Sequence, residues 1–393
     1  MRSGQAKMIL LVHSESEKYK FEDMKIVFIG QKGIPAVYGG VEKHVEEIAV
    51  RLARAGHDVT VFTRPSYTPA DLTDHRGVKL RSVFSLPTKH LDAITHTFLS
   101  IFYACRLKPD VVHFHSIGPS TLLWLAKLLM PRSALVATFH TQCYHHAKWN
   151  RFARWYLKIG EWMINRIPDR TITVSRVLTE YTLRRYGRVA SYIPNGVVLP
   201  RSVGAHHLAK WDLQAGDYIL SVSRLIRHKG IHHLIRAYQK IYPDKKLVIV
   251  GSGFHTDDYV AELEELAVGD PRIIFTGNQS GQALEQLFAN AALFVQPSES
   301  EGLSIALLEA MSYGLPIIAS DIPENQEALG RAGYFFRDRD SDDLADKIRL
   351  AISQPAAAQA KGREAKQRVT EQYSWEKISA EILALYESVR AEK

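Results

Sequence analysis

The fold is decided by residues 293–320, which read LFVQPSESEGLSIALLEAMSYGLPIIAS. Apolar runs at Leu293–Gln296 and Pro316–Ser320 have the length and composition of buried strands. Between them, Ile305–Ser312 carries apolar side chains at helical spacing. A strand, a helix and a second strand in this order place the two strands parallel in one sheet, with the helix on one face.

The same alternation of strands and helices runs through most of the chain. The other expected strands are Lys25–Gly30, Val59–Thr63, Val78–Val83, Asp110–His115, Ala134–His140, Thr171–Ser175, Ser191–Ile193, Tyr218–Val222, Lys246–Val250 and Arg272–Thr276. The other expected helices include Val41–Arg54, Pro119–Leu129, Ile231–Ile241, Tyr259–Ala267 and Gly281–Ala289. This pattern predicts an α/β fold with parallel sheets that are covered by helices on both faces.

The pattern starts again after an irregular stretch at Pro194–Leu208, which contains prolines and glycines and has the features of a linker. We therefore predict two doubly wound, Rossmann-like domains that face a cleft, the first over residues 24–200 and the second over residues 201–374. Residues 1–23 are expected to form a poorly structured extension. Residues 375–393 have the spacing of an amphipathic helix, and their apolar stripe could pack on either domain.

The composition is that of a globular protein and excludes several classes. Of 393 residues, 46% are hydrophobic and 23% are charged, as in ordinary soluble domains. The only two cysteines, Cys105 and Cys143, exclude a disulfide scaffold and a multi-cysteine metal cluster and favour a reducing compartment. The longest apolar run is shorter than a membrane-spanning helix, and the first residues lack the features of a secretory signal. We therefore expect a cytoplasmic protein.

The charge is unevenly distributed along the chain. The net charge is +8, and the excess of Lys and Arg lies in residues 24–200, whereas the second half is slightly acidic. Such a basic half indicates a polyanionic or membrane-surface partner, or simply a basic surface. Within it, residues 145–168 combine basic side chains with Trp149, Trp155 and Trp162. This composition suits an anionic membrane that carries a lipid-diphosphate acceptor, and it equally suits a helix that covers the domain core.

The loop after the first expected strand is rich in glycine. Residues 30–42 read GQKGIPAVYGGVE and lead into a helix. Gly39 and Gly40 would let the backbone approach a ligand closely, and amides at a helix start favour anions. We expect contact with phosphate or sugar here, with a plain glycine-rich turn as the alternative. The G-x-G-x-x-G fingerprint is missing from this loop, which disfavours an NAD-dependent oxidoreductase.

Further polar residues follow other expected strands. Arg224 and Lys229 lie between a strand and the next helix, where a guanidinium and an ammonium could neutralise a diphosphate. His140 ends its strand and could hydrogen-bond a substrate from a rigid mount, with a structural histidine as the alternative. His113 and His115 share one face of a strand, but further metal ligands are not evident, so no metal site is predicted.

The strongest signal is a pair of acids after the strand at 293–296. Glu301 follows that strand, and Glu309 lies about two turns into a helix that we expect to begin near Leu303. An acid inside an apolar segment needs a partner, and the paired hydroxyls of a ribose are one. Glu301 could accept hydrogen bonds from sugar hydroxyls while the amides of Gly302 to Ser304 face anionic oxygens. We predict that the two acids and the two basic residues named above converge on one pocket.

In combination, these motifs resemble those of the retaining glycosyltransferases of family 4, which have the GT-B fold. The two acids have the spacing of the E-x7-E motif of that family. Similar matches are SRLIRHKG at Ser223–Gly230, IPNGV at Ile193–Val197, GSG at Gly251–Gly253 and FTG at Phe275–Gly277. The loop at 30–42 resembles that of a bacterial subset that builds cell-surface polysaccharides and includes rhamnosyltransferases. Ser304 stands where the family usually has a glycine, which makes this loop less permissive.

The resemblance implies a site for a nucleoside-diphosphate sugar, mainly on the second domain. Its implied residues are Gly39, Gly40, His140, Arg224, Lys229, Glu301, Gly302, Leu303, Ser304 and Glu309. Arg224 and Lys229 would hold the diphosphate, Glu309 the ribose and Glu301 the sugar hydroxyls. His140 would touch the donor sugar from the first domain, and the two glycines would line the phosphate side. The resemblance also implies that residues 375–393 cross back onto the first domain.

The implied reaction moves the sugar to a glycan or lipid-linked acceptor with retention of anomeric configuration, in the synthesis of cell-surface polysaccharide. The protein would work in the cytoplasm, with possible peripheral contact at the inner face of the membrane. Cationic side chains and helix-start amides would stabilise the leaving diphosphate, so neither a cofactor nor a metal is expected. The Asp-x-Asp sequence at 338–340 lies in a polar stretch and is interpreted as a solvated loop.

Two other functions stay open on the sequence alone. A nucleotide-sugar 2-epimerase also has two similar domains, but it would lack this spacing of acids in this context. A basic nucleic-acid-binding protein is suggested by the charge, but no known module of that kind is evident and no nucleic-acid partner is expected. The nucleotide, the sugar, the acceptor and the oligomeric state are not predicted.

Overall fold

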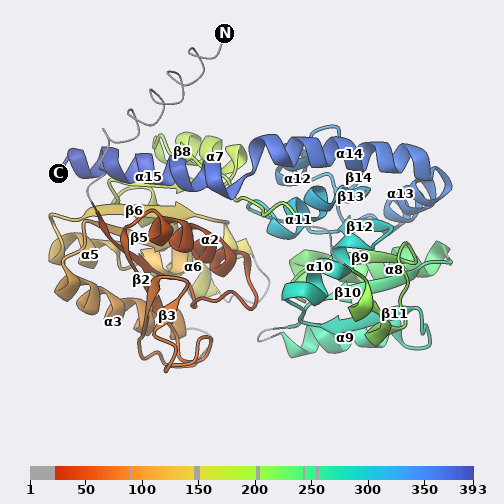
Figure 1. Ribbon diagram of the computed structural model, residues 1–393, viewed down its shortest axis with the longest axis horizontal. Helices are drawn as coiled ribbons and strands as arrows, with labels where there is room; N and C mark the ends of the chain where they lie inside the picture. The colour runs from red at the N-terminus through yellow and green to blue at the C-terminus, as the bar shows by residue number, and fades with distance from the viewer. Residues whose placement is uncertain (1–22, 89–90, 146–150, 201–203, 242–243, 254–255) are drawn as a thin grey trace, which may run out of the picture.

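The computed structural model describes residues 23–88, 91–145, 151–200, 204–241, 244–253 and 256–393. Over these residues the chain forms two Rossmann-like α/β domains, each built around its own sheet (Figure 1). This confirms the predicted fold class. Apart from Asp23, the expected extension over residues 1–23 lies outside the described residues.

The first domain is built on an eight-stranded sheet in the order β3-β4-β2-β1-β5-β6-β7-β8. Its strands are β1 (Lys25–Ile29), β2 (Asp58–Thr63), β3 (Asp74–His75), β4 (Val78–Ser82), β5 (Val111–His115), β6 (Ala134–Phe139), β7 (Arg170–Thr173) and β8 (Ser191–Tyr192). Its helices are α2 (Gly40–Arg54), α3 (Asp92–Leu107), α4 (Ile117–Ser120), α5 (Leu123–Leu129), α6 (Arg151–Ile164) and α7 (Arg176–Tyr186). All neighbouring strands are parallel except β3 and β4. The loops after β1, β5 and β6 therefore leave the sheet at one edge.

The second domain repeats this design with six parallel strands in the order β11-β10-β9-β12-β13-β14. Its strands are β9 (Tyr218–Val222), β10 (Lys246–Val250), β11 (Ile273–Gly277), β12 (Leu293–Gln296), β13 (Ile317–Ser320) and β14 (Tyr334–Phe336). Its helices are α8 (Ile231–Ile241), α9 (Asp257–Ala267), α10 (Gly281–Ala289), α11 (Ile305–Tyr313), α12 (Pro323–Leu329), α13 (Ser341–Ser353) and α14 (Pro355–Gln372). β9 lies between β10 and β12, so the loops after β9 and β12 are neighbours.

Side chains alternate between the two faces of each buried strand. In β1, Ile26 and Phe28 pack with α2 on one face, whereas Val27 and Ile29 join the core on the opposite face. In β9, Ile219 packs towards α8, and Leu220 packs towards α11. Both sheets are thus covered on both faces, as the near-continuous apolar runs of their strands predict.

The last helix, α15 (Trp375–Ala391), returns to the first domain. Its apolar stripe, formed by Trp375, Ile378, Ile382, Tyr386 and Val389, is fully buried in the same core as α2 and β1. In Figure 1, α14 and α15 follow each other along one side of the molecule, so that the chain crosses from the second domain back to the first. The sequence alone left the packing partner of this helix open, and the resemblance implied the observed one.

Two expectations about single elements were wrong. The expected helix Pro119–Leu129 is two short helices, α4 and α5, separated at Thr121 and Leu122. Helix α11 begins at Ile305 rather than near Leu303, so Glu309 lies only about one turn from its start. The polar stretch at 338–340 is a partly exposed loop, as expected, and the side chain of Asp340 in addition accepts hydrogen bonds from the first amides of α13.

Among the described residues, no helix combines the length and the apolar character that are needed to cross a membrane.

Candidate functional site

The loops after β9 and β12 are joined by a salt bridge. Nζ of Lys229 lies 2.5 Å from Oε1 of Glu301, and both side chains are largely buried. The same oxygen also accepts a hydrogen bond of 2.7 Å from the side-chain amide of Gln296, the last residue of β12. Because both contacts use Oε1, Oε2 of Glu301 keeps its capacity to accept hydrogen bonds. The ammonium of Lys229 likewise has further protons to donate.

The turn before Lys229 is held against the other loop by a close backbone contact. A Cβ atom on Gly230 would lie 1.9 Å from the carbonyl oxygen of Pro297, so only glycine fits at this position. The amide of Glu299 donates to the carbonyl oxygen of His228 at 2.8 Å. These contacts between the two loops explain why residues 72 positions apart form the ion pair.

Arg224 lies apart from this ion pair. It follows β9 directly and is exposed, and its side chain has no hydrogen bond or ion pair with the described part of the chain. The neighbouring Arg227 differs, since its guanidinium pairs with Glu262 and lies over the ring of Tyr259. The structure therefore brings together Lys229 and Glu301, whereas the predicted convergence of Arg224 with them stays a prediction.

Glu309 lies on α11, and its carboxyl interacts electrostatically with charged side chains of both domains. Burial raises the pKa of this carboxyl to about 7. Lys43 of α2 lowers this pKa, and Glu47 of α2 and Glu285 of α10 raise it. The carboxyl of Glu309 is thus close enough to the first domain to interact with charged side chains of α2.

The two domains meet through the loop that leads into α11, and we call this contact the domain junction. A Cβ atom on Gly302 would lie 1.7 Å from the carbonyl oxygen of His140, so the two backbones are in direct contact. A Cβ atom on Gly40, the first residue of α2, would lie 3.7 Å from the side chain of Ile305. The predicted residues His140, Gly40 and Gly302 therefore gather at one place, although they come from different domains.

The same junction contains Leu303, Ser304 and Gly39. Leu303 and Ser304 are buried, and the hydroxyl of Ser304 accepts a hydrogen bond from the amide of Leu307 at the start of α11. Gly39 precedes α2. Within the glycine-rich loop, the amides of residues 32 and 36 donate to the carboxylates of Glu42 and Glu46. These two amides are therefore already satisfied and are not available to an anion.

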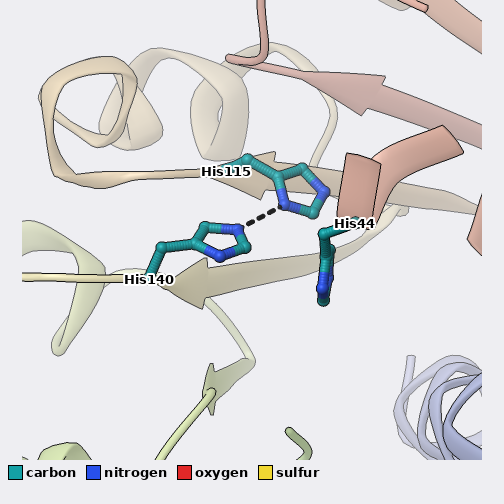
Figure 2. Close-up of side chains that lie close together, drawn as sticks. All are labelled: His44, His115 and His140. Carbon is teal, nitrogen blue, oxygen red and sulfur yellow. Dashed lines mark hydrogen bonds between the residues drawn. The ribbon is translucent and has the colours of Figure 1, made fainter. Parts of the chain in front are cut away.

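A cluster of buried imidazoles surrounds His140 (Figure 2). Nε2 of His140 forms a hydrogen bond of 3.0 Å with Nδ1 of His115, and the ring of His44 stands edge-on to that of His140 at 4.8 Å. His113 lies next to His115 and bonds to Tyr386 of α15. Burial lowers the pKa of His44 to about 4 and those of the other three far below the usual value. All four rings are therefore neutral at pH 7.

Three of these histidines could hold a metal ion. The ligand atoms of His44, His115 and His140 lie within 4.8 Å of one another. The hydrogen bond between His115 and His140 uses one proton and one lone pair, so this neutral pair can offer only one bare outer nitrogen. A three-histidine site would therefore require this hydrogen bond to break. In a second group, formed by His232, His233 and Glu299, the possible ligand atoms also lie within 4.8 Å of one another.

Asn195 links the imidazole cluster to the second domain. Its Oδ1 accepts a hydrogen bond of 2.9 Å from Nδ1 of His44, while its Nδ2 donates to the carbonyl oxygen of Leu303 at 2.7 Å. Sequence reasoning did not single out His44 or Asn195 as site residues. Asn195 lies within the IPNGV match, which could have drawn attention to it, whereas His44 sits in a helix and carries no comparable signal.

Comparison with known proteins identifies two domains. Residues 38–201 match the family described as Glycosyltransferase Family 4, and residues 209–368 match Glycosyl transferases group 1. The chain is 28% identical to glycogen synthase from Mycobacterium tuberculosis, over 92% of this chain and 94% of that protein. It is also 28% identical to phosphatidyl-myo-inositol mannosyltransferase from Mycolicibacterium smegmatis, over 90% of this chain and 91% of that protein.

A solved structure shows the same architecture. Anabaena HepE, in complex with UDP and glucose, superposes with a TM-score of 0.79 at 20% identity and covers 93% of this chain and 100% of its own. At this identity the similarity concerns the fold, which is GT-B. The two family matches support a glycosyltransferase and not the alternatives of an epimerase or a nucleic-acid-binding protein. The chain is a glycosyltransferase of the GT-B fold, in which a glycosyltransferase-4-type domain precedes a glycosyl transferases group 1 domain.

Proposed function

We propose that the enzyme transfers a sugar from a nucleoside-diphosphate sugar, bound mainly by the second domain, to a glycan or lipid-linked acceptor on the first domain. The observation that carries this proposal is the Lys229–Glu301 ion pair of the second domain, in which Glu301 directly precedes Gly302 of the domain junction. The ammonium of Lys229 can bind a diphosphate and the carboxylate of Glu301 can bind sugar hydroxyls, and Nζ and Oε1 of these two groups lie 2.5 Å apart. HepE, which has the same fold, was solved with UDP and glucose.

Each predicted residue receives a role that its environment permits. Lys229 and the exposed Arg224 would bind the diphosphate, and the amides of Gly302 to Ser304 would add the positive end of α11. Oε2 of Glu301 would accept from hydroxyls of the sugar, and Glu309 would bind the ribose. His140 would contact the donor sugar from the first domain, with Gly39 and Gly40 on the phosphate side.

The proposed reaction proceeds with retention of anomeric configuration. The bond between the anomeric carbon and the diphosphate oxygen breaks, and the acceptor oxygen forms its bond on the same face of the sugar. The proton of the acceptor hydroxyl passes to the departing diphosphate, so no separate base is needed. Lys229, Arg224 and the amides at the start of α11 stabilise the charge on the leaving group. The proposal requires neither a cofactor nor a metal.

The acceptor is proposed to be linked to a lipid, for synthesis of cell-surface polysaccharide at the inner face of the membrane. Helix α6 buries Leu157 and Ile164 in the domain, as a core-covering helix should, whereas its opposite face exposes large aromatic side chains. Phe152 is 72% and Trp155 is 59% exposed, and basic residues flank them. Trp149 lies outside the described residues. Aromatic and basic side chains on one face suit an anionic membrane surface.

The membrane proposal predicts a loss of vesicle binding when this face is made polar. In the double variant Phe152→Ser/Trp155→Ser, binding to phosphatidylglycerol vesicles should fall by roughly tenfold or more, because two large apolar side chains no longer enter the interface. Sedimentation with vesicles measures this. The matched control is Val268→Ser, which removes an exposed apolar side chain from the second domain. Equal binding of the double variant and the wild type would exclude α6 as the contact.

The donor proposal is tested by a panel of UDP-, GDP- and dTDP-linked radiolabelled sugars with a membrane extract as acceptor source. One donor should give labelled product, and Arg224→Ala should lower turnover by roughly tenfold or more, since a charged contact to the leaving group is lost. Arg227→Ala is the matched control, because Arg227 lies three residues away but pairs with Glu262. Equal turnover of both variants would remove Arg224 from the site.

A further inference from the structure

The hydrogen bond between His115 and His140 restricts where the protons of these two rings can lie. Both rings are neutral because burial lowers their pKa values, so each carries a single proton. The bond joins Nδ1 of His115 to Nε2 of His140 and uses one of the two protons. The other proton therefore lies either on Nε2 of His115 or on Nδ1 of His140.

The surroundings of these two outer nitrogens decide between the alternatives. Nε2 of His115 is enclosed and has no hydrogen-bond partner among the described residues. A proton there would be a buried N–H group without an acceptor, which native structures avoid more strictly than an unused lone pair. Nδ1 of His140 is not among the enclosed unpartnered atoms, and Figure 2 shows it on the side of the ring away from His115. Of the two outer nitrogens, Nδ1 of His140 is therefore the one on which a proton costs less.

Two further contacts hold the ring of His140 in place. His115 is roughly parallel to it, with an angle of 30° between the rings, and His44 stands nearly perpendicular to it at 89°. His44 is itself fixed, because its Nδ1–H donates to Oδ1 of Asn195. The direction of Nδ1 is therefore set by side chains from α2 and β5, neither of which is next to His140 in the sequence.

We propose that His115 is a positioning residue that donates from Nδ1 to Nε2 of His140 and so keeps the proton of His140 on Nδ1, as a hydrogen-bond donor to an oxygen of the donor sugar. The last part rests on the proposed function, in which His140 contacts that sugar. The first part, the position of the proton, does not depend on it.

The position of the proton can be measured without any substrate. In the full-length enzyme labelled with ¹⁵N-histidine, nitrogen–proton correlation spectra separate protonated from bare ring nitrogens. His140, assigned by the loss of its signals in His140→Ala, should carry its proton on Nδ1. In His115→Leu, His140 should become a mixture of both forms. A bare Nδ1 in the wild type would overturn the proposal, and so would an unchanged His140 in a folded His115→Leu variant.

Kinetics then test whether His115 acts through His140. His115→Leu should lower kcat/KM by roughly three- to tenfold, as for the loss of one neutral hydrogen bond, and His115→Gln should restore part of it through its amide donor. In a His140→Ala background, His115→Leu should have no further effect. Independent, multiplicative losses would overturn the proposed coupling. If His140→Ala has normal kinetics while the spectra are as expected, the sugar contact fails but the positioning holds.

His113 provides the matched control. It lies on the same strand and is equally buried, but it bonds to Tyr386 and Thr138 rather than to His140. His113→Gln should lower the unfolding temperature without changing the proton position of His140. If it changes that position as much as His115→Leu does, the effect belongs to the packing of the whole cluster, and the specific role of His115 is refuted.

Discussion

At the scale of single residues, the carboxyl of Glu309 should make donor binding depend on pH. Its pKa is about 7 because burial disfavours the charged form, with Glu47 and Glu285 adding to this effect and Lys43 opposing it. A carboxylate accepts both ribose hydroxyls, whereas the protonated acid accepts less well. The KM for the donor should therefore fall as the pH rises from 6 to 8. In Glu309→Gln it should be roughly tenfold higher and flat over this range. A wild-type profile as flat as that of the variant would remove Glu309 from donor binding.

The sequence singled out some residues of the candidate site and not others, for a physical reason. Glu301 and Lys229 carry charge on loops that follow parallel strands, where ligands of such sheets bind, so residue type and position pointed to them. His44 and Asn195 are different, because what matters is their mutual contact, and 151 positions separate them. His113 and His115 were placed on one face correctly, but His115 contacts His44 of α2 and His140, which follows β6. A strand pattern contains no information about partners on other elements.

At the scale of elements, the long buried strands and the helices between them were predictable because their apolar periodicity is uninterrupted. The elements that the sequence did not predict are short or begin in segments with competing signals. Strand β14 has three residues, too few for a periodic pattern. Helix α13 begins in a run of charged residues, and Asp340 was not recognised as its N-cap although aspartate before a helix is a common N-cap. Strand β14 is defined by its pairing with β13, which a three-residue pattern cannot predict, whereas the N-cap of α13 is a local signal that the sequence already carried.

The contact between the loop before α11 and the end of β6 leads to a prediction about Gly302. In Gly302→Ala, the new methyl group would meet the carbonyl oxygen of His140, so the loop must move away from the first domain. We expect kcat/KM to fall by roughly tenfold or more while the second domain stays folded, because misplaced contacts in the transition state are costly. Ser300→Ala, two residues earlier in the same loop, is the control and should be nearly normal. Comparable kinetics for the two variants would show that this contact does not matter for activity.

At the scale of the whole molecule, the first domain is built from two separate parts of the chain. Its last element, α15, follows the whole second domain in the sequence but packs against α2 and the sheet of the first domain. The helix also contacts the segment between the domains, where Gly196 lies against the ring of Trp375. Asn195, the neighbouring residue, reaches both His44 and Leu303. The stability of the first domain and the geometry of the domain junction are therefore linked through the same segment.

This linkage predicts that Trp375→Ala destabilises the first domain, although the residue belongs to the last helix. Trp375 is fully buried, and removal of a buried tryptophan costs about 3–5 kcal/mol through lost apolar contacts and the cavity that is left. Hydrogen exchange should speed up in α2 and β1, while the amides of β9, β10 and β12 keep their protection. Glu381→Ala, at an exposed position of the same helix, should leave both domains unchanged. Equal loss of protection in both sheets would show that the two domains unfold as one unit and that α15 does not belong to the first alone.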